Sequence, residues 1–374
     1  MIYVHVPLCR SFCTYCGFYS EKCSDAAAEK TVDSVVKEIS LSEIPLERNT
    51  IYMGGGTPSV LPPFLLQKIV RACSDACFRS AGRVVPEGGL WKWDEFTFEA
   101  NPDDIVRKGL DYVRNLASLG VDRVSLGAQS FSDDVLRWMN RRHGAADIST
   151  AVRLLREGGI HNISLDFIFG ISFLSDDVLS DSIHRAVDLG VQHISCYQLS
   201  VEEGSALENL IARGRYKEAS PELCSRQYEL VCGILSEAGF NHYEISNFAR
   251  PGFEARHNSS YWEHIPYIGF GPGAHSLLVD GAGKWIRRWN KPDLNSYIEG
   301  SFARGEEVLS EEQMKMETIM LGLRTASGVD SSALGTNEYA DRLLSKGLLQ
   351  RTGGRIRIPE KYFFISDNII RDLV

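Results

Sequence analysis

Short hydrophobic runs alternate with segments of helical spacing through the first two-thirds of the chain. The runs are rich in β-branched or aromatic residues and are bounded by Gly, Pro, Asn or Asp, which is typical of β-strands. They cover residues 2–6, 50–53, 96–99, 122–126, 163–169 and 193–199. Apolar residues recur at helical spacing between them, at residues 26–40, 63–76, 106–119, 149–157 and 177–189. This alternation predicts parallel strands joined by right-handed βαβ connections.

The C-terminal part of the chain has a different pattern. Apolar spacing predicts helices over residues 311–324 and 331–346. Gly353 and Gly354 then separate two short alternating runs, which indicates a tight hairpin. Helices followed by a hairpin are typical of a winged-helix module. Such modules often bind DNA, but the acidic balance of this chain favours a packing or partner-docking role.

Composition and charge place the chain among globular proteins. Of its 374 residues 44% are hydrophobic and 24% charged, which excludes disordered and collagen-like chains. With 40 Lys and Arg against 49 Asp and Glu, the net charge of −9 argues against a nucleic-acid partner. No apolar run approaches the roughly 18 residues of a membrane-spanning helix, and residues 1–6 do not resemble a secretory signal. We therefore expect no transmembrane segment and a cytoplasmic location.

The nine cysteines carry the first chemical signal. Their odd number in a long chain argues against a disulfide scaffold and for a reducing compartment. Cys9, Cys13 and Cys16 have the spacing C-x3-C-x2-C directly after the first predicted strand. Three thiolates on one loop can hold three irons of a [4Fe–4S] cluster and leave the fourth iron open. Structural zinc usually takes four ligands in pairs, but the spacing alone leaves zinc, or three incidental cysteines, as alternatives.

Polar residues recur where the predicted strands end. The turn at residues 54–58, Gly-Gly-Gly-Thr-Pro, follows the second strand, Glu99 closes the third, and Asp166 lies within the fifth. In parallel α/β folds the ligand site lies at the carboxyl ends of the strands. Asn101 and Ser130 are residue types that cap helices, and we expect that role for them.

Residues 3–16 read Y-x-H-x-P-x-C-x3-C-x-Y-C, which resembles the signature of radical S-adenosylmethionine (SAM) enzymes. The fit is closest to the oxygen-independent coproporphyrinogen III oxidases and the related HemW-type heme chaperones, and it covers nearly the whole chain. It runs through IYMGGGTPSVL, FEANPDD, RVSLGAQSF, MNRRHG, SLDFIFGI, HISCYQLSVEEGSAL, YEISNFA, HNSSYW and YIGFGPGAHS. The resemblance implies a [4Fe–4S] cluster held by Cys9, Cys13 and Cys16, SAM on its open iron, and a protein that reduces the cluster.

The resemblance also implies the contacts to SAM. By motif position they are Tyr3, Tyr15, Gly55, Gly56, Thr57, Glu99, Gln129, Arg141 and Asp166. Tyr15 would pack on the adenine, Arg141 would pair with the SAM carboxylate, and Glu99 and Asp166 would accept hydrogen bonds from the ribose. A solvated helix end for Arg141, or a lysine partner for Glu99, is the alternative.

The expected fold is α/β, an incomplete (β/α)6 TIM-like radical SAM barrel followed by a smaller, mainly helical C-terminal domain. We expect the partial barrel over residues 1–210 and an extension and connecting segment over residues 211–300. The helical, winged-helix-like domain would occupy residues 301–374.

One position separates the two branches of this resemblance. The oxidases carry a fourth cysteine two residues after the third, where this chain has Phe18, and they also carry an N-terminal extension. Both features favour the chaperone branch, which binds heme and hands it to an acceptor protein. The oxidative decarboxylation of coproporphyrinogen III is the alternative, and a zinc-stabilised or metal-free interaction protein is a third hypothesis.

The segment HNSSYW matches a motif of the chaperone branch. This match implies that His257 is an axial ligand of heme iron, with Tyr261 and Trp262 beside the macrocycle. Basic residues of the run 284–289 would meet the propionates. A structural role for His257 is the alternative, and His242 and His275 are competing candidates for the ligand.

Overall fold

The structure is a computed structural model and describes residues 1–374 except 303, 372 and 374. Its core is a nine-stranded sheet in the order β11-β1-β4-β5-β6-β7-β8-β10-β9. All six predicted strands are confirmed, and neighbours among them pair in parallel. They are β1 (Ile2–Val6), β4 (Thr50–Gly55), β5 (Glu95–Ala100), β6 (Arg123–Gln129), β7 (Asn162–Phe169) and β8 (His193–Gln198).

Three short strands extend this sheet at its edges. β11 (Ile268–Phe270) pairs in parallel with β1 at one edge. At the other edge β10 (Asn247–Ala249) runs antiparallel to β8, and β9 (Asn241–Glu244) runs antiparallel to β10. The two outermost strands, β11 and β9, are not neighbours in the strand order, so the sheet curves without closing. The expectation of an incomplete barrel is confirmed.

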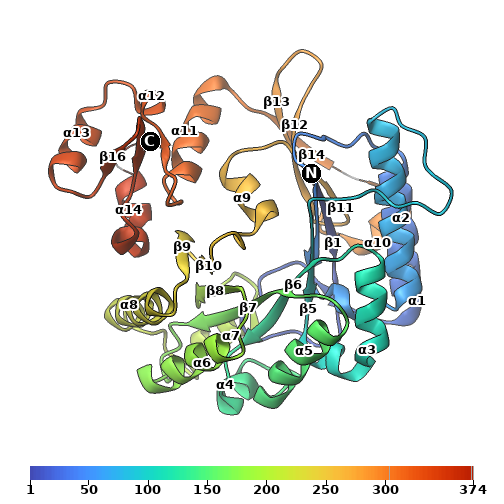
Figure 1. The fold of residues 1–374 in the computed structure, drawn as a ribbon, viewed down its shortest axis with the longest axis horizontal. Coiled ribbons are helices and arrows are strands. Elements are labelled where there is room, and N and C mark those ends of the chain that lie inside the picture. The colour runs from blue at the N-terminus through green and yellow to red at the C-terminus, as the bar shows by residue number, and fades with distance from the viewer. Residues whose placement is uncertain (303, 372, 374) are drawn as a thin grey trace.

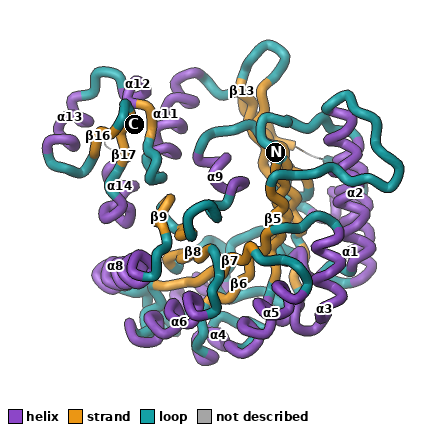
Figure 2. The backbone as a smooth tube through the Cα atoms, viewed as in Figure 1, coloured by secondary structure: helices purple, strands orange, loops and turns teal. Residues whose placement is uncertain are grey.

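Helices pack along the outer side of the curved sheet (Figures 1 and 2). Those that the apolar spacing predicts are confirmed, with N-terminal extensions in some cases. They are α1 (Asp25–Ser40), α2 (Pro63–Ser80), α3 (Pro102–Ser118), α5 (Ala145–Glu157) and α6 (Asp176–Asp188). The structure adds α4 (Asp133–Trp138), α7 (Ala206–Ala212) and α8 (Pro221–Glu237).

Alternation along the strands gives the barrel two different faces. On β6, Val124 and Leu126 belong to the hydrophobic core, while Arg123 and Ser125 line an interior cavity. Because successive side chains of a strand point to opposite faces, the apolar set packs against the helices and the polar set fills the inside. The interior of a TIM barrel is usually packed with branched apolar residues, so this polar lining indicates a ligand chamber.

A second, three-stranded sheet follows the barrel. It consists of β12 (His275–Val279), β13 (Trp285–Asn290) and β14 (Arg304–Val308), all antiparallel. The short helix α10 (Leu294–Ile298) lies between β13 and β14. Buried Glu38 of α1 accepts hydrogen bonds from Asn290, Tyr297 and Arg304, which fixes this sheet to the barrel. The pairing of β13 with β14 joins residues on both sides of position 300, and the domain boundaries stay a prediction.

The C-terminal elements have the order of a winged helix. A helix, a strand, two helices and a hairpin follow one another: α11 (Glu311–Gly322), β15 (Val329–Asp330), α12 (Ser331–Leu334), α13 (Glu338–Ser345), β16 (Gln350–Thr352) and β17 (Arg355–Arg357). The predicted hairpin is confirmed, but the predicted helix 331–346 is divided, because Gly335 takes a φ of 59°. The last helix, α14 (Ser366–Arg371), packs nearby, and these elements lie together, away from α1 to α3 (Figure 1).

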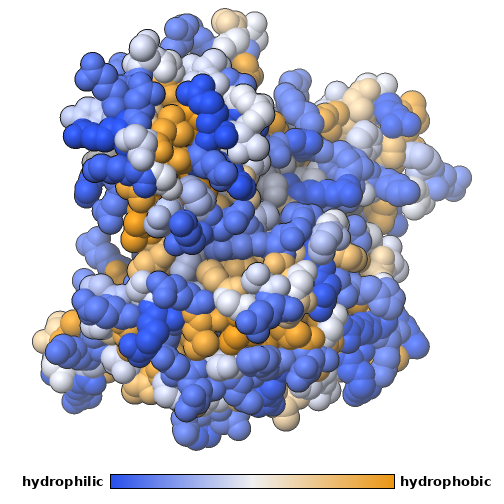
Figure 3. Space-filling view, turned by 60° about the vertical axis from the view of Figure 1, so that its left-hand side comes forward, coloured by the Kyte–Doolittle hydropathy of each residue, from blue (hydrophilic) through white to orange (hydrophobic). Residues whose placement is uncertain are grey.

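The surface agrees with the composition. Hydrophilic residues cover most of the face drawn in Figure 3, and hydrophobic residues gather mainly in its lower half. Within the described part of the chain, no helix combines the length and the apolar character that crossing a membrane requires.

Candidate functional site

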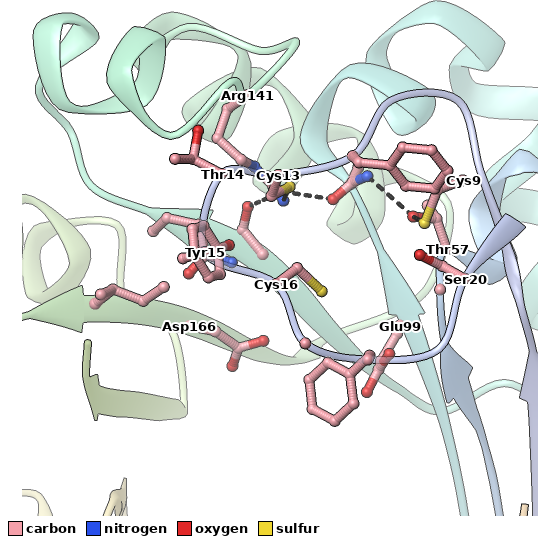
Figure 4. A pocket seen from close by; sticks show the side chains of 18 of the residues that line it. Cys9, Cys13, Thr14, Tyr15, Cys16, Ser20, Thr57, Glu99, Arg141 and Asp166 are labelled. Carbon is pink, nitrogen blue, oxygen red and sulfur yellow. Dashed lines mark hydrogen bonds between the residues drawn. The ribbon is translucent and has the colours of Figure 1, made fainter. Parts of the chain in front are cut away.

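The three cysteines lie on a closed loop at the carboxyl end of β1. The loop is tied at its base where β2 (Leu8–Cys9) pairs with β3 (Glu21–Lys22). At its tip, Thr14 donates its backbone N–H to Met139 and its hydroxyl to the Trp138 carbonyl, at 3.1 and 2.8 Å. The loop is therefore held at both ends, and its three cysteines line one cavity (Figure 4).

The donor set fits a cluster better than a single ion. Cys9 Sγ lies 3.4 Å from Thr57 Oγ1, and the Arg141 guanidinium donates to Cys13 Sγ across 3.2 Å. Burial raises the pKa of Cys16 to about 11, so a bound cation is needed to hold it as thiolate. Among the described residues, no three His, Cys, Asp or Glu side chains converge on one metal-sized point. Three thiols spread along a loop suit a [4Fe–4S] cluster, whose irons each take one cysteine.

A cavity of about 1090 Å³ opens beside the cysteine loop, inside the barrel. Eight of the nine residues predicted to contact SAM line it: Tyr15, Gly55, Gly56, Thr57, Glu99, Gln129, Arg141 and Asp166. Tyr3 does not line it, because its hydroxyl is hydrogen-bonded to His5 Nδ1 at 2.9 Å behind the glycine turn. The fold thus brings residues from four parallel strands and from the loops beside them to one chamber.

Glu99 is the most constrained acid of the chamber. Tyr52 donates its hydroxyl to Glu99 Oε1 across 2.5 Å, and the Gly55 N–H donates to Oε2 across 3.0 Å. Burial raises the pKa of Glu99 to about 7, although both hydrogen bonds act in the opposite direction. The carboxylate is fixed in place and close to the balance between its charged and neutral forms at physiological pH.

The glycine turn approaches its neighbours too closely for a side chain. Gly55 has a φ of 108°, and a Cβ there would lie 2.5 Å from the His5 ring. At Gly56 a Cβ would lie 2.8 Å from the backbone nitrogen of Leu8. Only glycine allows this contact between the turn and the start of the cysteine loop.

Arg141 connects the cysteine loop to the strand ends. Besides Cys13, its guanidinium contacts the Gly127 carbonyl at 2.8 Å and the Asn101 side chain. The Asn101 amide in turn lies 3.4 Å from Thr57 Oγ1. Asn101 occupies the N-cap position of α3, as expected, but its side chain makes no capping hydrogen bond and contacts Arg141 instead.

The expectation of a helix cap is wrong for Ser130. Ser132 occupies the N-cap position of α4, and its backbone N–H donates to Ser130 Oγ across 3.1 Å. Ser130 therefore stabilises the turn that precedes α4 and does not cap the first turn of this helix.

Asp166 lies across the chamber from the cysteine loop. Ser125 donates to its carboxylate at 2.8 to 3.0 Å, and Ser164 at 3.2 Å. Burial raises the pKa of Asp166, while these serines act to lower it. Figure 4 shows Asp166 and Glu99 on the same side of the loop, below Cys16.

The HNSSYW segment forms α9 (Arg256–Trp262) and presents its histidine inward. His257 is fully buried, with Nδ1 2.9 Å from Thr50 Oγ1 and Nε2 3.0 Å from the Tyr261 hydroxyl. Burial lowers its pKa to about 3. With both ring nitrogens engaged, His257 does not fit the predicted role of heme ligand in this conformation, and Tyr261 serves as its partner.

Trp262 faces a different space from the cysteine loop. It lines a cavity of about 500 Å³ between α9 and the C-terminal elements, with residues such as Thr318 and Arg355. Asn258 of the same segment lines the main chamber. The motif therefore lies between two cavities, and its residues do not form one continuous binding surface for a macrocycle.

The two competing histidines differ in accessibility. His242 stacks on Phe248 with ring centroids 4.1 Å apart and lies 3.3 Å from the Tyr228 hydroxyl. His275 is exposed, and its ring makes no hydrogen bond to any residue that the structure describes. It lies beside Trp289, with ring centroids 6.2 Å apart.

The two arginines of the run 284–289 already have acidic partners. Arg287 pairs with Glu317 at 2.6 Å, and Arg288 pairs with Glu306 at 2.9 Å. A propionate would have to compete with these carboxylates.

Sequence reasoning missed several residues of the chamber. Tyr52, Arg123, Ser125, Ser195 and Asn258 all line it. A signal for most of them was present, because Tyr52, Ser125 and Ser195 occupy inward positions of strands that were predicted correctly. Residues paired across neighbouring strands face the same side of a sheet. Ser125 pairs with Glu99, Ser195 pairs with Asp166, and Tyr52 pairs with Thr97, two residues before Glu99.

Comparisons with known proteins agree with this geometry. The model of the radical SAM superfamily matches residues 3–186. The heme chaperone HemW of Lactococcus lactis is 31% identical over 380 residues, covering 98% of this chain and 95% of the relative. The HemW of Mycobacterium tuberculosis is 32% identical over 386 residues, covering 100% and 94%.

The solved structure of the Escherichia coli coproporphyrinogen III oxidase (HemN), a radical SAM enzyme, superimposes with a TM-score of 0.79. It shares 19% identity and covers 100% of this chain and 89% of that one, so it supports the fold alone. Radical SAM proteins take a [4Fe–4S] cluster and SAM, which the cysteine loop and the chamber fit. On the full-length similarity to its relatives, the chain belongs to the HemW family of the radical SAM superfamily.

Proposed function

We propose that this protein is a heme chaperone on a radical SAM scaffold, which binds heme and transfers it to an acceptor protein. The support is the similarity over nearly the full length to proteins named heme chaperone HemW. Phe18, 73% exposed at the chamber, stands where the oxidases carry a further cysteine. This substitution is the observation that favours the chaperone over the oxidase.

Cys9, Cys13 and Cys16 are the proposed ligands of the cluster. In the same proposal the chamber residues hold SAM, with Arg141 meeting its carboxylate and Glu99 and Asp166 its ribose hydroxyls. Tyr15 and Gln129 would complete the wall around the nucleoside. Tyr3 would act from behind, by holding His5 against the glycine turn.

We propose His275, and not His257, as the axial ligand of heme iron. A chaperone must release its cargo, so an exposed ligand suits the task better than a buried one. His275 is solvent-accessible, and its partial desolvation together with the charge of Arg287 lowers its pKa, which favours the neutral imidazole that binds iron. Trp289 beside it offers an aromatic surface to the macrocycle.

The partners in this proposal are a heme acceptor protein and a protein that reduces the cluster. A cytoplasmic location is part of it, supported by nine cysteines that are all free thiols. The winged-helix-like C-terminal part is the proposed docking element for a protein partner rather than for DNA, because the chain is acidic.

One preparation tests the function. The protein is reconstituted anaerobically with iron and sulfide, and aliquots receive either heme or coproporphyrinogen III with SAM and a reductant. We expect saturable heme binding in the Soret band, transfer to an apo-acceptor, and no vinyl product. Vinyl product would establish the oxidase instead, and an absence of saturable heme binding would refute the chaperone.

The ligand itself has a spectroscopic test. His275→Ala should change the Soret maximum and the iron EPR signal of the heme complex, whereas His257→Gln should leave both unchanged. The reverse result would restore His257 as the ligand.

A further inference from the structure

Arg123 is a buried cation that the proposed function does not use. It is the first residue of β6, lines the chamber, and is only 2% exposed. Its Nε is enclosed without an acceptor, and the guanidinium makes no hydrogen bond or ion pair with any residue described in the structure. An enclosed charge without a partner is strongly unfavourable, so this arrangement calls for an acceptor from the chamber.

The neighbouring carboxylates are already engaged elsewhere. Asp166 accepts the hydroxyls of Ser125 and Ser164 and makes no hydrogen bond or ion pair with Arg123, although the positive charge of Arg123 acts to lower its pKa. Glu95, on the adjacent strand β5, accepts the backbone N–H groups at the start of α9 at 2.8 and 2.9 Å. Neither acid supplies Arg123 with the hydrogen bonds that a guanidinium can donate.

The basic and hydroxyl groups nearby are satisfied as well. His193 lies 2.8 Å from Ser164 Oγ and 2.8 Å from the Tyr243 hydroxyl. His257 has both ring nitrogens engaged, as described above. The amide of Asn258 differs from these groups. Asn258 lines the chamber, and its side chain makes no hydrogen bond to a described residue. Arg123 and Asn258 thus offer free donors to the same space.

This space lies deeper in the same chamber than the rim at Gln129, where SAM is proposed to bind. Gln129 is six residues after Arg123 on β6, which at about 3.3 Å per residue puts their Cα atoms at most roughly 20 Å apart. The chamber, at about 1090 Å³, lies at the upper end of ligand-pocket volumes. It has room for a small second ligand below the first.

We propose that the floor of the chamber is a carboxylate-binding subsite, with Arg123 as its cation and Asn258 as a further donor. A carboxylate matches the planar fork of a guanidinium and accepts two parallel hydrogen bonds from it. The occupant is a small organic acid, since the barrel interior at the floor is enclosed by strands. This inference does not depend on heme transfer.

The test is a titration of the reconstituted protein with sodium acetate, with chloride replaced to keep the ionic strength constant. A ligand that binds the native state raises Tm in a saturable way. We expect this rise in the wild type and in Arg153→Met, a control that removes an exposed arginine of α5. Arg123→Met should abolish the rise, and Asn258→Ala should shift its midpoint to higher acetate.

Should Arg123→Met not fold, Arg123→Lys decides, because lysine keeps the charge and lacks the fork. A midpoint at least tenfold higher in Arg123→Lys supports the subsite, and an unchanged midpoint overturns it. The absence of a saturable rise in the wild type also overturns it, as does a larger effect of inorganic phosphate than of acetate.

Discussion

Tyr52 holds Glu99 against the wall of the chamber through a hydrogen bond of 2.5 Å between its hydroxyl and Oε1. A hydrogen bond to a charged group contributes about 1.5–3 kcal/mol. We expect Tyr52→Phe to weaken SAM binding about tenfold, measured by calorimetry on the reconstituted protein. Tyr112→Phe removes a buried hydroxyl outside the chamber and should leave the affinity unchanged. Equal affinities for Tyr52→Phe and wild type would show that Glu99 does not need this support.

The raised pKa of Glu99 predicts that the free energy of unfolding depends on pH. Burial raises its pKa from 4.5 to about 7, so between these values the folded protein keeps a proton that the unfolded chain has lost. Stability therefore falls as pH rises through this window. In the cofactor-free protein, Glu99→Gln should remove this decline and be more stable than the wild type by about 2–3 kcal/mol at pH 8. Urea unfolding at pH 5 and pH 8 measures it; parallel pH profiles would contradict the shift.

Gly55 should tolerate no side chain, because its Cβ would meet the His5 ring at 2.5 Å. Gly55→Ala is expected to lower stability by about 1–3 kcal/mol and to weaken SAM binding. Gly88→Ala is the matched control, since Gly88 has a positive φ of 69° and open space around it. Thermal unfolding and SAM titration of both variants separate backbone strain from the close contact. Equal losses in the two would mean that the approach to His5 is unimportant.

Arg141 should affect the cluster as well as SAM. Its guanidinium lies 3.2 Å from Cys13 Sγ, so its positive charge stabilises the reduced, more negative cluster. Arg141→Met is expected to make the reduction potential more negative and to weaken SAM binding at least about tenfold. EPR-monitored redox titration measures the potential. Arg137→Met, which removes an exposed arginine of α4, should change neither property.

His257 should act on stability and not on heme binding. Burial lowers its pKa from 6.5 to about 3, so the unfolded chain gains a proton in this range while the folded protein does not. Stability is therefore complete above pH 6.5 and falls as the solution is acidified. His257→Gln should remove about 3 kcal/mol of this acid sensitivity between pH 7 and pH 4. Chemical unfolding at the two pH values checks it, and an unchanged slope would contradict the burial argument.

The sequence was sufficient to predict the strands of the barrel, but not the role of every residue in its motifs. The six parallel strands were found because each has a short apolar face packed on helices, and β1 was placed to the residue. β9 to β14 were missed because they are short and irregular, with pairing decided by distant neighbours. The heme role of His257 followed from residue types in HNSSYW, and those letters do not reveal that Thr50, remote in sequence, takes its Nδ1.

Iron and sulfide analysis of cysteine variants tests the central claim most directly. The triple variant Cys9→Ala, Cys13→Ala, Cys16→Ala is reconstituted anaerobically beside Cys23→Ala, in which the substituted cysteine neighbours Cys9 through the backbone but does not line the chamber. We predict near-wild-type iron, sulfide and visible absorption in Cys23→Ala, SAM-induced changes in its EPR spectrum, and no cluster in the triple variant. A triple variant that kept its full iron and sulfide content would contradict the account.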